Sequence, residues 1–164
     1  MRTNLSSQIT LNRVSTKYYK PENAVERSVL TRFEKVPTDI YESVDEGVCH
    51  IANEIAGKIQ DRQREGKFFV IGAGTGASLR PLYAELVRKH KDEGLSFRNV
   101  VVFNLYEYYP LAPKGAGSSF AQLRDLFVDR IDIDKQNVFT IDGSIPQESI
   151  LEYCRLYEQR LMTF

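Results

Sequence analysis

The stretch Phe68–Tyr83, FFVIGAGTGASLRPLY, decides the fold of this chain. Its first four residues form an unbroken apolar run, which is typical of a β-strand covered on both faces of its sheet. A glycine- and alanine-rich segment, Gly72–Ala77, follows, and Ser78 then opens a segment whose apolar residues recur at helical spacing. The order of strand, glycine-rich turn and helix predicts an anion site, because unpaired amides and the positive end of the helix dipole point outward there.

The glycine-rich turn allows more than one ligand. We expect a phosphate or a phosphorylated sugar, and the alternative is a tight turn that holds nothing. Gly72–Ala77 can also be written G-x-G-x-x-A, a variant of the dinucleotide-binding fingerprint. That fingerprint requires an acidic residue about 20 residues further on, at the end of the next strand. Here the first acidic residue beyond that strand is Glu107, about 30 residues past the turn, so the spacing counts against a dinucleotide-binding domain.

Strands and helices alternate along the rest of the chain. Two more apolar runs, Asn99–Asn104 and Asn137–Ile141, predict strands. Helical patterns begin after Pro21, at Ser43, after Ser78, near Phe120 and at Ser144, and a short strand is predicted near Thr38–Glu42. The helix from Ser43 is predicted to end at Gly66, and the helix after Ser78 is predicted to end before Gly94. Ser144 and Gln147 have the spacing of a capping box. This alternation predicts an α/β fold with a mainly parallel sheet.

The carboxyl ends of parallel strands are the place where such sheets bind ligands. In this chain those ends lead into three loops, Gly72–Ser78, Leu105–Ser118 and Asp142–Gly143. We expect the three loops to converge on one pocket. In particular, the amides after Ile71 and the side chains that follow Asn104 are predicted to face a shared cavity suited to a small anionic carbohydrate.

The composition narrows the class of protein. Lys+Arg and Asp+Glu both total 22, so nothing in the net charge favours nucleic acid or a membrane surface as a partner. Cys49 and Cys154 are the only cysteines, which argues against a disulfide framework and for a reducing compartment. No segment has metal-ligand spacing, signal-peptide character or the length of a membrane span. We therefore expect a cytoplasmic protein without a metal or a cofactor.

An ordered series of segments resembles the glucosamine-6-phosphate deaminase family. The segments are residues 71–78 (IGAGTGAS), 94–105 (GLSFRNVVVFNL), Glu107-Tyr108, Ile131–Ile133, Asn137-Val138 and Asp142-Gly143. The first stands where the family has a loop of the type LGLPTGGTP. The resemblance implies a Rossmann-like three-layer α/β/α fold over residues 37–164, preceded by an N-terminal extension, residues 1–36. The pattern of the sheet stops at Phe164, where another parallel strand is expected, so the chain is interpreted as the N-terminal half of a longer protein or as a natural short form.

The resemblance also implies a chemistry. Family members open the ring of glucosamine 6-phosphate, move a proton between C1 and C2, and release ammonia to give fructose 6-phosphate. By this resemblance the substrate-binding residues are Thr75, Gly76, Ala77, Ser78 and Ser118. The implied partner is a small sugar phosphate, no cofactor is implied, and family members commonly form homo-oligomers.

One position departs from the family pattern. The family reads Asn-Leu-Asp-Glu-Tyr, with the Asp as the base at C2, whereas this chain has Tyr106 in place of that Asp. A tyrosine, with a reference pKa near 10, would need about 4 kcal/mol of selective phenolate stabilisation to act as a base at neutral pH. Glu107 is the other candidate, although adjacent residues of an extended segment point to opposite sides. Tyr106 and Glu107 are thus the candidate catalytic residues, and a relative that binds a sugar phosphate without turnover is the alternative function.

Overall fold

The computed structural model describes residues 21–33, 36 and 38–164, which divide between Gly47 and Val48 into two compact units. In the first unit, helix α1 (Ala24–Thr31) begins where the Asn23 side chain accepts a hydrogen bond from Glu26 N, and none of its residues is buried. The strand predicted near Thr38–Glu42 is wrong, because the described residues there form no strand. Instead, Glu42 N donates a hydrogen bond to the Glu46 carboxylate, in the first turn of the next helix. The predicted boundary at residue 36 stays a prediction.

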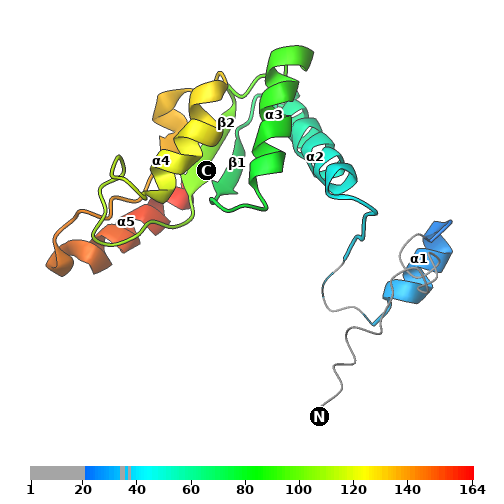
Figure 1. Cartoon of the computed structure of the whole chain (residues 1–164), viewed down its shortest axis with the longest axis horizontal. Coiled ribbons are helices and arrows are strands. Elements are labelled where there is room, and N and C mark those ends of the chain that lie inside the picture. Colours follow the sequence, from blue (N-terminus) through cyan, green and yellow to red (C-terminus); the bar gives the residue numbers. More distant parts are fainter. Residues whose placement is uncertain (1–20, 34–35, 37) are drawn as a thin grey trace, which may run out of the picture. The chain divides into compact units, whose positions relative to one another are not determined.

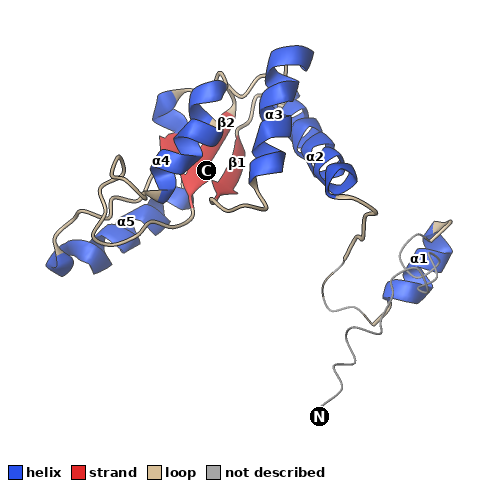
Figure 2. Cartoon of the chain, in the orientation of Figure 1, coloured by secondary structure: helices blue, strands red, loops and turns tan. Residues whose placement is uncertain are grey.

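A parallel sheet forms the centre of the second unit, with the strand order β1-β2-β3 (Figures 1 and 2). The elements in chain order are α2 (Val44–Arg64), β1 (Phe69–Ala73), α3 (Arg80–Glu93), β2 (Val100–Asn104), α4 (Ser119–Leu126), β3 (Val138–Phe139) and α5 (Ile150–Leu161). Short 3-10 turns lie at Val128–Arg130, Lys135–Asn137 and Gln147–Ser149. The predicted α/β class with a parallel sheet is confirmed.

The predicted ends of the long helices follow from local chemistry. Ser43 Oγ accepts a hydrogen bond from Glu46 N at 3.1 Å, which starts α2 as predicted. Gly66 and Gly94 follow α2 and α3 with φ values of 67° and 72°, a left-handed conformation that glycine adopts without steric cost. Helix α3 begins at Arg80 rather than at Ser78, because residues 77–79 form a turn.

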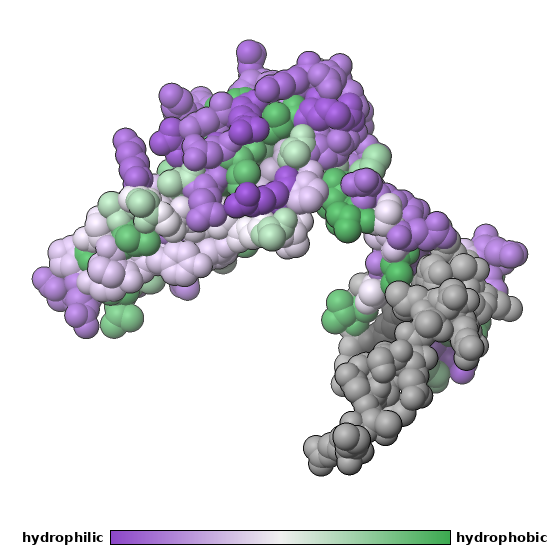
Figure 3. Space-filling model, viewed as in Figure 1, coloured by the Kyte–Doolittle hydropathy of each residue, from purple (hydrophilic) through white to green (hydrophobic). Residues whose placement is uncertain are grey.

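The main hydrophobic core lies between one face of the sheet and the helices α2, α3 and α4. Val100 and Val102 of β2 pack with Ile59 of α2, Leu86 of α3 and Leu123 of α4. Tyr83 stacks on Phe127 at 5.0 Å between ring centroids, and Phe127 meets Phe97 edge-on. Hydrophilic side chains cover most of the outer side of α3 and α4, with apolar ones visible between the two helices (Figure 3). On this face the β2 side chains are fully buried, whereas Phe69 and Ile71 of β1 are half-buried.

Helix α5 covers the opposite face over β2 and β3. Phe103 of β2 stacks on Phe139 of β3 with 4.7 Å between ring centroids, and Tyr157 of α5 meets Phe103 edge-on. The Tyr157 hydroxyl donates to the Asn104 carbonyl at 2.9 Å, and burial raises the pKa of this tyrosine to about 12. The sheet therefore has helices on both faces, as the predicted three layers require.

Two of the predicted strands differ in detail from the observed ones. β1 is not covered on both faces: Val70 is 36% exposed, whereas all five residues of β2 are buried. The reason is that, within the described residues, β1 pairs with β2 alone, and an apolar run does not reveal whether its strand is central or at an edge. β3 is limited to Val138–Phe139, since beyond it the Thr140 carbonyl accepts from the Tyr153 hydroxyl.

The predicted start of the last helix is wrong. Ser144 and Gln147 form no capping box, because Ser144 N and Oγ both donate to Asp142 Oδ1, at 2.9 and 2.6 Å. An aspartate two residues upstream offers the serine a local turn that competes with a helix cap. Helix α5 begins at Ile150, after the 3-10 turn. Among the helices described, none is long and apolar enough to cross a membrane.

Candidate functional site

The loops that follow the three strands meet at one end of the sheet, as predicted. The Leu105 side chain lies so close to Gly72 that a Cβ there would be 2.7 Å from Leu105 Cδ2. Likewise, a Cβ on Gly143 would be 2.4 Å from the Leu111 carbonyl oxygen. The second loop is therefore in direct contact with the first and with the third. The cavity predicted between the amides after Ile71 and the side chains after Asn104 is wrong at Gly72 and Gly74, because Leu105 and Tyr106 pack against these two glycines.

Tyr106 connects the second loop to the glycine-rich turn. Its hydroxyl accepts a hydrogen bond from Thr75 N at 3.0 Å, lies 2.8 Å from Thr75 Oγ1 and contacts the Thr75 carbonyl. The ring lies over Gly74, where a Cβ would be 3.2 Å from Tyr106 Cε1. The Thr75 amide is thus already paired within the chain.

This contact also changes the acidity of Tyr106. The hydrogen bond with the Thr75 side chain is the main cause that lowers the pKa of the phenol below its ordinary value. Burial acts in the opposite direction, as does the negative charge of Glu107. No cationic side chain is among these causes. The geometry therefore makes Tyr106 a hydrogen-bonding partner of the turn, without the cation that a phenolate base would call for.

Two further side chains hold the turn in place, and no sequence pattern predicts either role. Ser119 Oγ lies 2.9 Å from Thr75 Oγ1, and Ser119 is fully buried at the start of α4. The Tyr83 hydroxyl donates to the Gly74 carbonyl at 2.7 Å. Tyr83 stood out in the sequence only as an apolar position on a helical face. Together these residues fix Gly74 and Thr75, so only the second half of the turn is open.

The open half consists of Gly76, Ala77 and Ser78, all three exposed. None of their amides has a hydrogen-bond partner among the described residues, and a Cβ on Gly76 would meet nothing within 4 Å. These amides immediately precede α3, whose first residue is the exposed Arg80. Free amides at a helix start, next to a cation, form a surface that can bind an anion.

Glu107 has a different environment from Tyr106. Its Oε1 accepts hydrogen bonds from Ser119 N at 2.8 Å and Tyr108 N at 3.0 Å, and its Oε2 accepts from Phe120 N at 3.1 Å and from Ser118 Oγ at 2.6 Å. Burial alone would raise the pKa of this carboxyl, but these four donors together lower it. Glu107 is therefore an ionised acceptor at the positive end of α4, with both oxygens in use.

Ser118 belongs to the same helix start. It is fully buried, and its hydroxyl accepts from Ala121 N at 3.1 Å, which makes Ser118 the N-cap of α4. Five of the predicted site residues thus gather around the glycine-rich turn: Thr75, Gly76, Ala77, Ser78 and Tyr106. The other two, Glu107 and Ser118, hold the adjoining helix. The roles assigned to all seven in binding or catalysis stay predictions.

Asn104, the last residue of β2, holds the backbone of the second loop. It is completely buried, and its Nδ2 donates to the Tyr106 carbonyl at 3.0 Å, which fixes the backbone of the second loop. Its Oδ1 has no hydrogen-bond partner among the residues that the structure describes. In the part of the chain that the structure describes, no three His, Cys, Asp or Glu residues lie together as a metal site would require.

Comparison with known proteins finds relatives whose sequences are similar to this chain. No family model matches the chain. A glucosamine-6-phosphate deaminase-like protein of Bacteroides thetaiotaomicron is 60% identical over 164 residues, all of this chain and 25% of that protein. The glucosamine-6-phosphate isomerase of Candida albicans is 34% identical over 125 residues, which are 76% of this chain and 48% of the enzyme.

Solved structures give the same result for the fold. A monomeric glucosamine-6-phosphate deaminase of the NagB superfamily superposes with a TM-score of 0.68 and 28% identity, over 75% of this chain and 48% of that one. A 6-phosphogluconolactonase of Thermotoga maritima shares the fold, with a TM-score of 0.55 at 23% identity, over 71% of this chain and 50% of that one. The chain spans between a quarter and about half of the length of these proteins. In sequence and in fold, the chain is similar to part of these glucosamine-6-phosphate deaminases.

Proposed function

We propose that this chain binds the phosphate of an amino-sugar phosphate, glucosamine 6-phosphate, as its share of a deaminase-like protein. The observation that carries the proposal is the row of exposed amides at Gly76–Ser78, between the carboxyl end of β1 and the first turn of α3, which no group in the described part of the chain pairs. Three successive donors at a helix start favour a phosphate over a neutral group. The similarity to glucosamine-6-phosphate deaminases supports the choice of ligand.

We propose further that the chain by itself does not convert the sugar to fructose 6-phosphate and ammonia. That reaction needs a base at C2, and both candidates are engaged elsewhere. The Tyr106 hydroxyl is hydrogen-bonded to Thr75, and the Glu107 carboxylate accepts from four donors. A carboxylate that is stabilised in its ionised form is a weaker base than a free one. Binding without turnover is therefore the function that this geometry supports best.

Gly76→Ala tests the binding site. The structure has room for the new methyl group, so the fold is expected to remain, but the methyl group would stand beside the amides that receive the phosphate. We expect affinity for glucosamine 6-phosphate to fall about tenfold, the loss of roughly one charge-assisted hydrogen bond. Isothermal titration calorimetry measures this change. Gly57→Ala is the matched control, because Gly57 also has nothing within 4 Å of the added Cβ and lies in α2.

Turnover is measured in the same samples as release of ammonia and fructose 6-phosphate. Saturable binding with no product supports the proposal, whereas product formed by the unmodified chain contradicts the second part of it. If glucosamine 6-phosphate at millimolar concentration neither binds nor raises the melting temperature, the first part is wrong.

Tyr106→Phe separates the two roles considered for Tyr106. The phenyl ring can still pack on Gly74, while loss of the hydroxyl frees the Thr75 amide for a ligand oxygen. We expect a loss of about 1 kcal/mol in the free energy of unfolding, and phosphate binding that is unchanged or a few-fold tighter. Urea unfolding and calorimetry measure the two effects. If the unmodified chain does turn the sugar over and this variant abolishes the reaction, Tyr106 is a catalytic residue.

A further inference from the structure

A cavity between α4 and β3 is lined by side chains that have no part in the candidate site. Its volume is about 350 Å³, which is within the range of sites for small molecules. The lining comes from the second loop, from α4 and the turn that follows it, from the turn before β3, and from β3 with the residue after it. None of the seven predicted site residues is among the lining residues.

The floor of this cavity is apolar and belongs to the hydrophobic core. Phe120 of α4 and Val138 of β3 are partly buried and pack against the core, and Val128 is a core residue that is 7% exposed. Close packing beneath these side chains holds them in place before any ligand arrives. The cavity therefore offers a preformed apolar surface to the body of a small molecule.

The rim of the cavity has more positive than negative charge. It contains three cations, Lys114, Arg124 and Lys135, and one carboxylate, that of Asp129. Arg124 pairs with this carboxylate, with 2.7 Å between Nη2 and Oδ2. Neither lysine has an ion pair with another residue that the structure describes. The excess of charge is local, because basic and acidic residues are equal in number over the whole chain.

Both lysines stand on turns whose backbone is held by hydrogen bonds. The turn 112–115, which contains Lys114, is closed by a bond of 2.8 Å from its last N–H to its first carbonyl. Lys135 begins the 3-10 turn before β3, where the Asp134 carboxylate accepts from Gln136 N at 3.0 Å and from Gln136 Nε2 at 2.9 Å. The carboxylate next to Lys135 in sequence is thus engaged by the turn. Fixed backbone therefore carries two ammonium groups to the rim, and both remain available to an anion.

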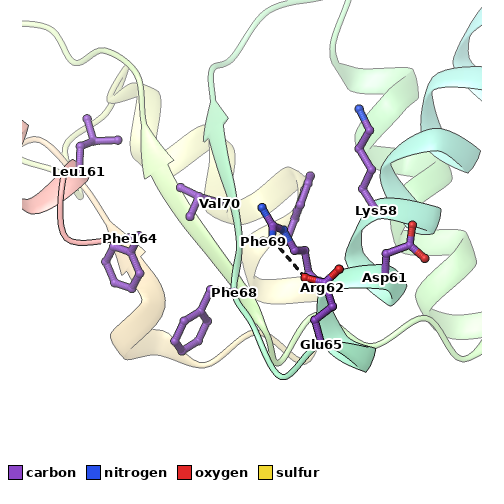
Figure 4. A pocket seen from close by; sticks show the side chains of 9 residues that line it. All are labelled: Lys58, Asp61, Arg62, Glu65, Phe68, Phe69, Val70, Leu161 and Phe164. Atoms are coloured by element: carbon purple, nitrogen blue, oxygen red, sulfur yellow. Dashed lines mark hydrogen bonds and ion pairs between the residues drawn. The ribbon is translucent and has the colours of Figure 1, made fainter.

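The larger cleft along β1 differs from this cavity in its charge (Figure 4). It also has apolar side chains, but its charged wall carries two cations, Lys58 and Arg62, and two carboxylates, Asp61 and Glu65. Arg62 pairs with Glu65 at 3.3 Å, and Lys58 pairs with Glu54 at 2.8 Å. Of these two cavities, the one between α4 and β3 is therefore the one that joins an apolar floor to an excess of positive charge.

We propose that the cavity between α4 and β3 binds a small organic anion with an apolar body, such as an aromatic carboxylate. The apolar body lies on Phe120, Val128 and Val138, and the negative group pairs with Lys114 and Lys135. Two cations attract one carboxylate together, and the low-dielectric floor beside them strengthens this attraction. A bare inorganic anion leaves the floor unused, and a neutral aromatic molecule leaves the lysines unused.

Titration of the isotope-labelled chain with 2-naphthoate, followed through the amide signals in NMR spectra, tests the proposal. We expect saturable shifts at Lys114, Lys135 and Val138. The same body without the charge, 2-naphthalenemethanol, is expected to bind about tenfold more weakly, the effect of two partly exposed ion pairs. Acetate, the same charge without the body, is expected to give no saturation at equal concentrations. Saturable shifts at Phe68–Val70 alone, no saturable shifts, or equal affinity for the naphthoate and the alcohol each overturn the proposal.

Lys114→Gln and Lys135→Gln give an independent readout. Both lysines are exposed, so the fold is expected to remain. Each variant is expected to bind 2-naphthoate about three- to fivefold more weakly, and the double variant about tenfold, with no change for 2-naphthalenemethanol. Lys91→Gln is the matched control, because Lys91 is an exposed lysine in the last turn of α3 and does not line the cavity. Unchanged affinity in the double variant, or an equal loss in the control, contradicts the proposal. Neither result depends on phosphate binding at Gly76–Ser78, because those residues do not line the cavity.

Discussion

Replacing Gly143 by alanine is expected to lower the free energy of unfolding by about 3 kcal/mol or more. The added Cβ would lie 2.4 Å from the Leu111 carbonyl oxygen and 2.5 Å from the Tyr108 carbonyl oxygen. Both are backbone atoms of the second loop, and Leu111 N donates to the Tyr108 carbonyl at 2.8 Å, so the loop cannot yield without breaking its own turn. The variant has to separate the second and third loops.

Urea unfolding at neutral pH measures this effect. Gly57→Ala is the same chemical change at a helical position with free space, where alanine is expected to stabilise by about 0.5–1 kcal/mol. The two glycine variants should therefore change stability in opposite directions. If Gly143→Ala unfolds within about 0.5 kcal/mol of the unmodified chain, the contact between the two loops is absent in solution.

Glu107→Ala is expected to cost about 2–3 kcal/mol of the free energy of unfolding. The carboxylate satisfies two backbone N–H groups at the start of α4, one in its own loop and the Ser118 hydroxyl. Removing it leaves partly buried donors without a partner and removes a negative charge from the positive end of the helix. Glu148→Ala is the control, since Glu148 is exposed at the start of the turn before α5; it should change stability by less than about 0.5 kcal/mol.

The same carboxylate makes a pH-dependent contribution whose sign follows from its lowered pKa. A carboxyl group with a folded-state pKa below its unfolded value near 4.3 stabilises the fold above that value, and loses this effect as pH falls through the folded pKa. The stability difference between the unmodified chain and Glu107→Gln should thus be constant above about pH 5 and shrink below about pH 4. A difference that instead grew on acidification would show that Glu107 is not held as an ion.

The glycines of the turn Gly72–Ala77 serve different purposes, so they are not all evidence for a bound ligand. Gly72 and Gly74 leave room for the side chains of Leu105 and Tyr106, so packing within the chain requires them. Gly76 has no such neighbour and is the one whose surroundings are open to a ligand. A glycine-rich turn after a strand is therefore evidence for a ligand only at positions that the protein's own side chains do not fill.

Much of the fold could be predicted from the sequence because it depends on local patterns. The apolar run Asn99–Asn104 predicted β2 to within one residue, and the glycines after α2 and α3 predicted where those helices end. Parallel strands joined by helices bring their carboxyl ends to one edge of the sheet, so the meeting of the second loop with the glycine-rich turn also followed, but the packing of Tyr106 against that turn did not. These features need no knowledge of distant contacts.

Tertiary structure alone decided the rest, because the same residue type can serve either a ligand or the fold. Ser118 and Glu107 stand at positions of a predicted site, yet hydrogen bonds to α4 use their polar atoms. Val70 belongs to an apolar run like that of β2, yet it lies at an open edge, because strand order depends on which helices cross which face. The sequence by itself determined the strands, the turn and the end of the sheet where they meet. Which amides remain free to bind an anion was decided only by the side chains that folding brings against them.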